Sequence, residues 1–255
     1  MSTLAVIPAR LGATRLPRKP LRLLAGVPLV VRVWERVTAL GVAERCVIAT
    51  DHHEIAEAAR AAGAEFALTD PGHPSGTDRV AEVAARAEFS DFGAILNVQG
   101  DEPFVSAEAL SGAVALVEGG RFPLATAAVP ASPEILATPD VVKVVCADDG
   151  RALYFSRAPI PYLRDGADSG MLSGLVRQHL GVYAYTREAL AKWVALPPHP
   201  LERVERLEQL RPLAAGVPMG VALLPEAPVH VRGIDTEDDL VHANERWSHL
   251  TAGWS

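Results

Sequence analysis

The chain has 255 residues, of which 49% are hydrophobic and 22% are charged, and its formal net charge at pH 7 is −7. This length is within the range of a single large α/β domain, and the composition allows a core of useful size to be buried. The acidic balance argues against non-specific nucleic-acid binding, which needs a basic face.

The cysteines and the N-terminal residues favour a reducing compartment. Cys46 and Cys146 both lie in apolar runs, which is typical of buried thiols rather than of a disulfide or a metal site. The apolar run over 4–7 is too short for the core of a signal peptide. No apolar run reaches the ~18 residues that a membrane-spanning helix needs. We therefore expect a soluble, cytoplasmic protein that does not insert into membranes.

The first half of the chain alternates short apolar runs with helical stretches. Strands are predicted over 4–8, 45–50, 64–68 and 94–98, and helices over 28–40, 52–61, 77–87 and 106–117. Strands that alternate with such helices are typical of βαβ units and a mainly parallel sheet. Because the predicted strands are continuously apolar, we expect both faces of this sheet to be covered.

The pattern changes in the middle of the chain, where strands predominate with Pro and Gly between them. Strands over 124–129, 141–145, 152–155 and 181–185 are expected to form an antiparallel lobe at about 124–185. Helices follow over 187–196 and 201–214, strands over 221–224 and 229–231, and a closing helix over 236–247. Without an internal repeat or a linker, the chain is predicted to be one α/β domain over 1–255. Its sheet is expected to be mixed, mainly parallel and Rossmann-like, with a small antiparallel insertion.

A stiff cationic loop follows the first predicted strand. Residues 8–22 carry five cations and no acid in a chain that is net negative. Pro8, Pro17 and Pro20 restrict the backbone, and Gly12 allows a close approach to a ligand. Because open α/β sheets bind ligands at the carboxyl ends of their strands, the loop suits a polyphosphate better than bulk solvent. It matches neither G-x-G-x-x-G nor G-x-x-x-x-G-K-[ST], which argues against a nicotinamide enzyme and a P-loop NTPase.

Two aspartates far apart in the chain end apolar runs. Asp101 follows the predicted strand over 94–98, and Asp235 precedes the closing helix. Thr236 is a good N-cap for that helix, with Asp239 three residues later in a capping-box arrangement, so Asp235 is free for another task. Two such aspartates could hold Mg²⁺ together with substrate phosphates. With the cationic loop they describe a phosphoryl-transfer site, and we expect the two carboxylates to approach closely near that loop.

The predicted helix over 201–214 places Glu208 beside an apolar stripe. Glu208 lies four residues after Val204, so it borders the buried face, where a carboxylate is unusual without a partner. An ion pair with a nearby arginine and a hydrogen bond to a ligand both explain it, and both stay open. His179, at the start of a predicted strand, is by its position a core histidine as readily as a ligand. The stripe consists of Leu201, Val204, Leu207 and Leu210.

Taken in series, the motifs of the chain resemble those of the 3-deoxy-manno-octulosonate (Kdo) cytidylyltransferases, also called CMP-Kdo synthetases. They follow the order of that family over nearly the whole chain. Each motif is weak to moderate alone, whereas ten in series are a strong signal. They are IPAR (7–10), TRLP with KPL (14–21), ATDH (49–52), SGTDR (75–79), NVQGDEP (97–103), VKVV (142–145), ALYFSR (152–157), HLGVY (179–183), LEQLR (207–211) and DT (235–236).

The resemblance implies a fold, a reaction and residue roles. The implied fold is that of the nucleotide-diphospho-sugar transferases, and the implied reaction transfers CMP from CTP to Kdo, an acidic 3-deoxy sugar, and releases pyrophosphate. It also implies Mg²⁺ as cofactor, a homodimer, and a place in lipopolysaccharide or capsule assembly. The implied catalytic residues are Arg10, Arg15, Lys19, Asp101 and Asp235, of which the two aspartates bind Mg²⁺. The implied CTP-binding residues are Ser75, Thr77, Arg79 and Gln99, and those that face the sugar are Arg157, His179, Tyr185, Glu208 and Gln209.

Two positions depart from the usual family pattern. Position 13 is Ala where the family usually has Ser, and position 18 is Arg where it usually has Gly. The related sialate cytidylyltransferases can carry a basic residue beside the matching lysine, so CTP use is expected to be kept. The sugar stays open between Kdo, 8-amino-Kdo and a sialate-like acid, and residues 157–185 are expected to hold the discriminating contacts. A competing hypothesis, a non-catalytic nucleotide-sugar-binding protein, predicts the loss of Lys19, Asp101 or Asp235, and all three are present.

Overall fold

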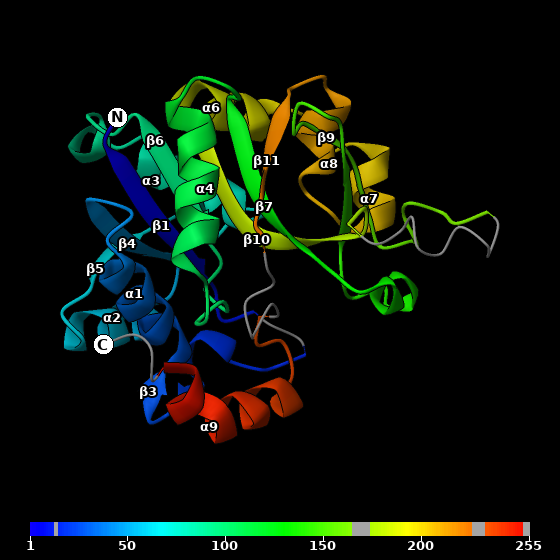
Figure 1. Ribbon diagram of the computed structural model, residues 1–255. Helices are drawn as coiled ribbons and strands as arrows, with labels where there is room; N and C mark the ends of the chain where they lie inside the picture. The colour runs from blue at the N-terminus through cyan, green and yellow to red at the C-terminus, as the bar shows by residue number, and fades with distance from the viewer. Residues whose placement is uncertain (13–14, 165–173, 226–232, 252–255) are drawn as a thin grey trace. The chain divides into compact units, whose positions relative to one another are not determined.

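The computed structural model describes residues 1–12, 15–164, 174–225 and 233–251 and divides into two compact units (Figure 1). The first unit contains residues 1–107 and 228–255, and the second contains residues 108–227. The chain has the mixed α/β fold expected from its sequence, with mainly parallel strands in one part and antiparallel pairs in another. The second unit is wider than the predicted lobe over 124–185. A single domain over the whole chain stays a prediction.

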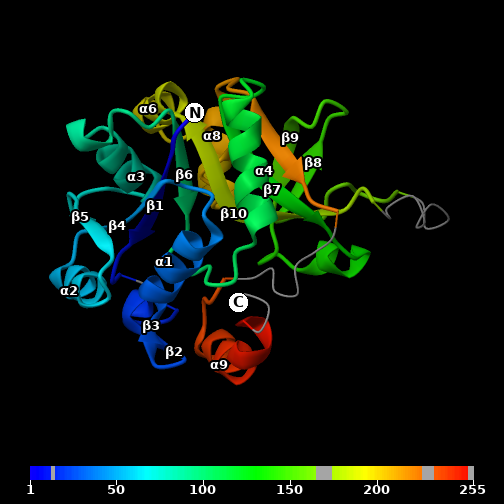
Figure 2. The same ribbon diagram turned by 60° about the vertical axis from the view of Figure 1, so that its left-hand side comes forward.

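The first unit is built on parallel strands that pair in the order β6–β1–β4–β5. They are β1 (Thr3–Ala9), β4 (Arg45–Thr50), β5 (Glu65–Leu68) and β6 (Ala94–Val98). Helices α1 (Leu29–Leu40) and α2 (His53–Ala61) cover one face, and α3 (Gly76–Ala84) covers the other (Figure 2). Every residue of β1 and β6 is buried, which is why their sequences are mostly apolar without alternation.

A small layer beside this sheet anchors the cationic loop. It contains the 3₁₀-helix η1 (Lys19–Leu21), the hairpin of β2 (Leu23–Leu24) and β3 (Val27–Pro28), and helix α9 (Glu237–Thr251). Asn244 of α9 accepts a hydrogen bond from Ala25 N at 2.8 Å, at the tip of that hairpin. Arg32 lies over the Trp247 ring at 4.7 Å. The loop and α9 share one apolar cluster, which contains Leu16, Leu24, Leu29, Ile234, Leu240 and Ala243.

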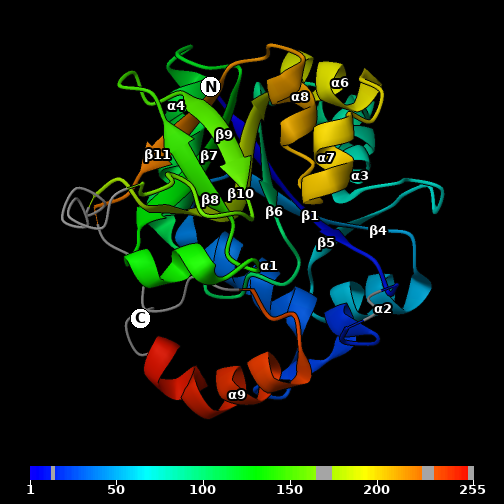
Figure 3. The same ribbon diagram turned by 90° about the vertical axis from the view of Figure 1, so that its right-hand side faces the viewer.

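The second unit combines a mixed set of strands with helices on both sides. Its strands are β7 (Leu124–Pro130), β8 (Lys143–Cys146), β9 (Ala152–Ser156), β10 (Arg177–Thr186) and β11 (Met219–Leu223). β7 pairs parallel with β11 and antiparallel with β10, and β8 pairs antiparallel with β9 and β10. Helix α4 (Ala107–Glu118) lies against β11, and α6 (Arg187–Ala195), α7 (Pro200–Glu205) and α8 (Leu210–Ala214) gather on the other side (Figure 3). The short 3₁₀-helices η2 (Ala87–Phe89) and η3 (Pro133–Ala137) complete the two units.

The predicted helix over 201–214 is wrong, because the chain forms two short helices there. α7 ends where Arg206 adopts a left-handed conformation with φ 54°, and α8 begins at Leu210. An ion pair between Glu202 and Arg211 joins the two helices. The predicted stripe is correspondingly split, since Leu207 and Leu210 are buried whereas Leu201 and Val204 are exposed.

Smaller differences concern element ends. α3 stops at Ala84 rather than at 87, and β10 begins at Arg177 rather than at 181, so that His179 lies inside the strand. The predicted strand over 229–231 and Ala13 lie outside the described residues. None of the helices in the described ranges has the length and hydropathy that a membrane crossing needs. Cys46 and Cys146 are free thiols, and burial raises the pKa of Cys46 to about 12.

Candidate active site

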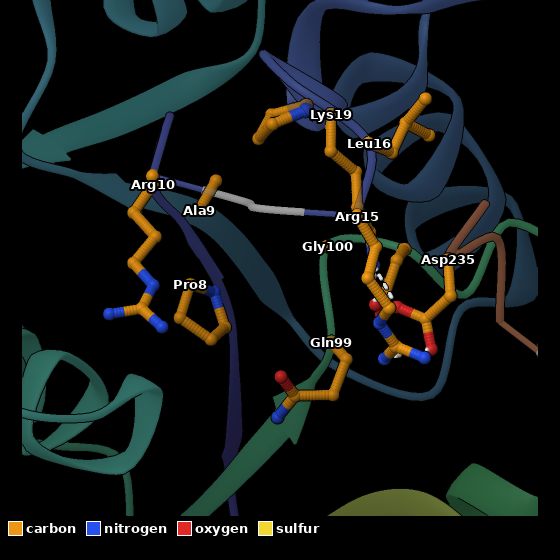
Figure 4. Close-up of a pocket in the computed structure, with 12 residues that line it drawn as sticks. Pro8, Ala9, Arg10, Arg15, Leu16, Lys19, Gln99, Gly100 and Asp235 are labelled. Atoms are coloured by element: carbon orange, nitrogen blue, oxygen red, sulfur yellow. Dashed lines mark hydrogen bonds and ion pairs between the residues drawn. The ribbon is translucent and has the colours of Figure 1, made fainter. Parts of the chain in front are cut away.

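A pocket of about 320 Å³ lies at the carboxyl ends of β1 and β6 (Figure 4). The two strands are parallel neighbours, so the segments that follow them start from the same edge of the sheet. The cationic loop follows β1, and the Gly100-Asp101 segment follows β6. The pocket is lined by Pro8, Ala9, Arg10, Gly12, Arg15, Leu16, Lys19, Pro20, Gln99, Gly100, Asp101 and Asp235.

Gly100 allows the two strand ends to approach each other. A Cβ atom at this position would lie 2.9 Å from the carbonyl oxygen of Pro8, closer than carbon and oxygen atoms pack without bonding. Any larger residue would push the end of β6 away from β1. The glycine therefore places Asp101 at the pocket edge.

Lys19 joins the two aspartates that the sequence singled out. Its Nζ donates to Asp235 Oδ1 at 2.7 Å and makes a short contact with Asp101 Oδ2. Arg15 Nη2 donates to the other oxygen of Asp235 at 3.0 Å. Burial lowers the pKa of Lys19, but the carboxylates of Asp101 and Asp235 outweigh it, so the net shift is upward. Both carboxylates thus lie at one ammonium group, as expected from their positions at the ends of apolar runs.

Local structure fixes Asp235 at this place. Thr236 Oγ1 accepts a hydrogen bond from Asp239 N at 3.2 Å, and Asp239 Oδ2 accepts one from Thr236 N at 2.8 Å. This is the predicted capping arrangement of α9. Asp239 Oδ2 also accepts a hydrogen bond from Asp235 N at 3.1 Å. Because Thr236 and Asp239 satisfy the helix start, the Asp235 side chain is left to face the pocket.

Glu102 is a third carboxyl group at this site, and the sequence reasoning missed it. Burial and the nearby charge of Asp101 raise its pKa to about 8. Its Oε1 would lie 3.0 Å from a Cβ atom built on Gly233, so it packs against the segment that leads to Asp235. An Asp-Glu pair after a strand is typical of an exposed turn. Only the position of Glu102 next to Asp101 could have drawn attention to it.

The remaining cations of the loop differ in their surroundings. Arg10 is exposed, and Figure 4 shows it across the pocket from Arg15 and Asp235. Arg18 has a left-handed backbone conformation with φ 58°, and its guanidinium group binds both carboxylate oxygens of Glu54. Arg18 is not part of the described pocket lining.

The four residues assigned to CTP by resemblance lie at two neighbouring places. Gln99 directly follows β6, and the others lie at the start of α3, namely Ser75, Thr77 and Arg79. Ser75 caps α3, since its Oγ accepts a hydrogen bond from Asp78 N at 3.3 Å. Thr77 is buried in the first turn of the same helix. A Cβ atom built on Gly76 would lie 3.3 Å from the Pro8 ring and 3.9 Å from Gln99 Oε1. The start of α3 therefore lies against the pocket wall.

Arg79, the fourth of these residues, is buried and held by two side chains. Its Nη2 donates to Asp51 Oδ2 at 3.0 Å, and its Nη1 makes a short hydrogen bond with Thr69 Oγ1. Its side chain is only 3% exposed, so a charged partner such as Asp51 is required. Asp51 belongs to the ATDH motif, but the sequence alone gave no reason to pair it with Arg79.

Arg157, assigned to the sugar, is fixed through backbone carbonyls in the second unit. Its Nε donates to Glu205 O at 2.9 Å and its Nη1 donates to Pro139 O at 3.1 Å. The Glu205 carboxylate in turn accepts hydrogen bonds from Ser156 Oγ and Arg157 N. These contacts use two of the five N–H donors of the guanidinium group, and the others could bind an anion.

Aromatic rings surround His179 and Tyr185, the two residues of β10 that the resemblance assigns to the sugar. Tyr185 is fully buried, and its ring lies 5.6 Å from that of Trp193. His179 is half-buried, with its ring 5.0 Å from Phe155. Burial lowers the pKa of His179 to about 3, so the imidazole is neutral at pH 7.

Glu208 and Gln209 lie between α7 and α8 rather than within one helix. Glu208 is half-buried, and its charge contributes, after burial and Tyr185, to raising the pKa of Tyr183. Gln209 is 2% exposed, and its Nε2 is the one buried side-chain nitrogen or oxygen in the described part of the chain that lacks a hydrogen-bond partner. An unsatisfied buried donor costs free energy, so this atom points to a ligand acceptor.

The donor set beside Lys19 fits a hard divalent cation. Asp101 and Asp235 both reach the same ammonium group, so their carboxylates are close enough for one cation to contact both. Mg²⁺ is commonly held by one or two carboxylates together with substrate phosphates. No group of three or more His, Cys, Asp or Glu suited to a metal occurs among the described residues.

Known proteins resemble this chain over nearly its full length. The model of a protein family described as cytidylyltransferase matches residues 4–219. A 3-deoxy-manno-octulosonate cytidylyltransferase of Gemmatimonas aurantiaca is 65% identical over 99% of this chain and 96% of its own. A relative of the same name from Acidobacterium capsulatum is 46% identical over 94% of each chain.

Solved structures agree with these relatives. A CMP:2-keto-3-deoxy-manno-octonic acid synthetase in complex with CTP matches with a TM-score of 0.88 and 32% identity, over 98% of this chain and 99% of that one. A cytidylyltransferase from Leptospira borgpetersenii matches with a TM-score of 0.62 at 17% identity, over 98% of this chain and 87% of that one. This second likeness concerns the fold alone.

Proposed function

This chain belongs to the family of 3-deoxy-manno-octulosonate cytidylyltransferases, and we propose that it transfers CMP from CTP to Kdo and releases pyrophosphate. It is a nucleotidyltransferase, so the hypothesis of a non-catalytic nucleotide-sugar-binding protein is set aside. The observation that carries the proposal is the convergence of Lys19, Asp101 and Asp235 on a pocket at the ends of two parallel strands. The whole-chain match to a CTP-bound synthetase supports it.

Nucleotide binding is assigned to the first unit. Arg10, Arg15 and Lys19 supply positive charge around the pocket, which suits the triphosphate of CTP. Ser75, Thr77, Arg79 and Gln99 are assigned to the cytosine and ribose. As the anomeric hydroxyl of the sugar attacks the α-phosphorus, negative charge develops on the phosphate oxygens. The ammonium group of Lys19, which lines the pocket, would stabilise that charge.

Mg²⁺ is the proposed cofactor, and Asp101 and Asp235 would hold it. When bound, the ion would neutralise charge on the phosphates. Without substrate, Lys19 neutralises the two carboxylates, which would otherwise repel each other. Asp101→Asn and Asp235→Asn should each abolish Mg²⁺-dependent turnover and Mg²⁺-dependent CTP binding measured by calorimetry. Asp238→Asn, an exposed carboxylate on α9, is the matched control.

Sugar recognition is assigned to Arg157, His179, Tyr185, Glu208 and Gln209 of the second unit. The free donors of Arg157 suit the carboxylate of a sugar acid, and the unpartnered Nε2 of Gln209 suits a sugar oxygen. Kdo is favoured over 8-amino-Kdo and sialate-like acids because the relatives above carry the Kdo name. A homodimer is part of the same proposal, from the resemblance alone.

The test is to incubate the protein with CTP, Mg²⁺ and a panel of sugar acids and to follow pyrophosphate release. Kdo should be used with the highest kcat/KM, ahead of 8-amino-Kdo and N-acetylneuraminate. Lys19→Ala should lower kcat by about a hundredfold, because one preorganised charge is worth ~3 kcal/mol in the transition state. Its Tm without substrate should also fall, because Asp101 and Asp235 lose the ammonium group that neutralises them. A Lys19→Ala enzyme that kept near-normal kcat at saturating CTP would remove Lys19 from the mechanism, and absence of release with every acid would overturn the proposed reaction.

A further inference from the structure

Thr126 lies beside His179 in the second unit, at an irregular place in the sheet. Thr126 of β7 is fully buried. The pairing of β10 with β7 shifts between Leu180, opposite Ala127, and Tyr183, opposite Thr126. The two residues in between leave the regular ladder, so their neighbouring carbonyl groups are available to side chains.

The Thr126 hydroxyl group contacts the carbonyl groups at this irregular place in the sheet. Its oxygen lies 2.7 Å from the carbonyl oxygen of Val182 and 3.2 Å from that of Leu180. It also lies 2.9 Å from Nε2 of His179. A hydroxyl group has one hydrogen to donate and two lone pairs that accept.

Counting hydrogens assigns the direction of each bond. Two oxygens at 2.7 Å repel unless a hydrogen lies between them, and a carbonyl group has none. The Thr126 hydrogen must therefore point to Val182 O, with Leu180 O as a weaker second acceptor. The contact with His179 then needs a hydrogen on Nε2, which donates to the Thr126 oxygen. Protonation of a neutral imidazole at Nε2 leaves Nδ1 as a hydrogen-bond acceptor.

The surroundings of His179 keep the ring neutral. Phe155 and Tyr183 pack against it with ring centroids at 5.0 and 5.5 Å. Burial lowers the pKa of His179 to about 3, so protonation of both nitrogens is disfavoured at pH 7. No partner of Nδ1 occurs in the described part of the chain, and Nδ1 is not among its buried atoms that lack a partner. The nitrogen is therefore accessible.

We propose that Thr126 is a positioning residue that fixes His179 as the Nε2–H tautomer, so that Nδ1 accepts a hydrogen bond from a hydroxyl group of the sugar acid. A neutral acceptor repels a carboxylate and cannot bind a second acceptor, whereas it suits a sugar hydroxyl. His179 thus selects for a hydroxyl group, and the acid group must be bound elsewhere. This inference rests on the proposed function, which assigns His179 to the sugar.

The test compares Thr126→Val with Thr126→Ser. Valine keeps the volume and removes the hydroxyl, whereas serine restores it. The ¹⁵N resonances of the His179 ring, assigned with His179→Gln, report the tautomer without any substrate. We expect the Nε2–H form in the wild type and in Thr126→Ser, and a mixture of tautomers in Thr126→Val. We also expect Thr126→Val to raise the KM for the sugar acid about tenfold, with the KM for CTP unchanged.

Val129→Ala on the same strand is the control for destabilisation alone. Val129 is buried, and its truncation should lower Tm while leaving the tautomer and the KM for the sugar unchanged. The proposal is overturned if the wild-type ring is protonated at Nδ1, or if Thr126→Val leaves the KM for the sugar within twofold of wild type. Absence of turnover in the wild type with every acid would instead count against the proposed function. The ring resonances would still decide whether Thr126 sets the tautomer.

Discussion

Arg18 is the residue at which this chain departs most visibly from the usual family pattern in the described loop. Its φ of 58° is a conformation that glycine adopts without strain and that other residues adopt at a cost of about 1 kcal/mol. The usual glycine at this position therefore has a backbone explanation. Here the arginine side chain binds Glu54 on α2, which gives the substitution a compensating contact.

Arg18→Gly should remove the backbone strain and also remove the contact with Glu54. The contact is exposed, and exposed ion pairs contribute little, so relief of strain should dominate. We expect Tm to rise by roughly 2 °C, measured by thermal unfolding. Arg18→Ala keeps the strain and loses the contact, so its Tm should fall below that of the wild type. If both variants were less stable than wild type by the same amount, loss of the contact with Glu54, rather than backbone strain, would account for the change in Tm.

Some residues of the site could be predicted from the sequence and others could not, for physical reasons. Asp101 and Asp235 could be anticipated because each ends an apolar run and because strand ends meet at one edge of a parallel sheet. Glu102 and Asp51 could not, since burial and pairing depend on residues distant in the chain. The role of Lys19 as a bridge between the aspartates needed three-dimensional coordinates.

At the scale of elements, the loop between β5 and α3 is held in place by hydrogen bonds to one carboxylate. Glu82 of α3 accepts hydrogen bonds from Asp70 N at 2.8 Å, from His73 Nε2 at 2.7 Å and from Arg86 Nη2 at 2.9 Å. Burial alone would raise its pKa, but these three donors lower it to about 2. The loop leads directly to Ser75, so Glu82 holds the segment that starts α3 at the pocket wall.

Glu82→Gln should therefore destabilise the protein in a pH-dependent way. The folded pKa is lower than the ordinary value of 4.5, so the stabilisation is complete above about pH 4.5 and is lost as pH falls toward 2. We expect Tm of the variant to be lower by roughly 3 °C or more at pH 7, with a difference that shrinks at pH 4 and again at pH 3. Glu57→Gln, an exposed carboxylate on α2, should show no such trend. A Tm difference that stayed constant from pH 7 to pH 3 would contradict this role of the Glu82 charge.

Element prediction was accurate where periodicity and local signals agreed. β4 and β6 have the predicted ends, because each contains a short, largely apolar run whose residues are mostly buried. The region of α7 and α8 was predicted wrongly because its helix break is at Arg206, and an arginine gives no sequence signal for a left-handed turn. The Glu202–Arg211 ion pair that joins the helices is a tertiary contact.

At the scale of the whole molecule, the residues assigned to the two substrates fall into different units. Those assigned to CTP and Mg²⁺ all belong to the first unit, and those assigned to the sugar all belong to the second. The order of the motifs along the chain made this family recognisable from sequence. The division into units was not predictable, because it depends on which segments pack together, and residues 233–251 pack with the N-terminal sheet unit.

Arg157→Ala should consequently separate the two binding steps. The sugar carboxylate loses a cation, so the KM for the sugar acid should rise by about tenfold or more. The affinity for CTP with Mg²⁺, measured by calorimetry without the sugar, should stay within about twofold of wild type. Lys19→Ala should show the opposite pattern, with weaker CTP binding, since Lys19 lines the pocket of the first unit. Arg203→Ala, which removes an exposed arginine from α7, controls for a general loss of charge and should change neither quantity. If Arg157→Ala weakened CTP binding as much as it weakened use of the sugar, the assignment of separate residues to the two substrates would be wrong.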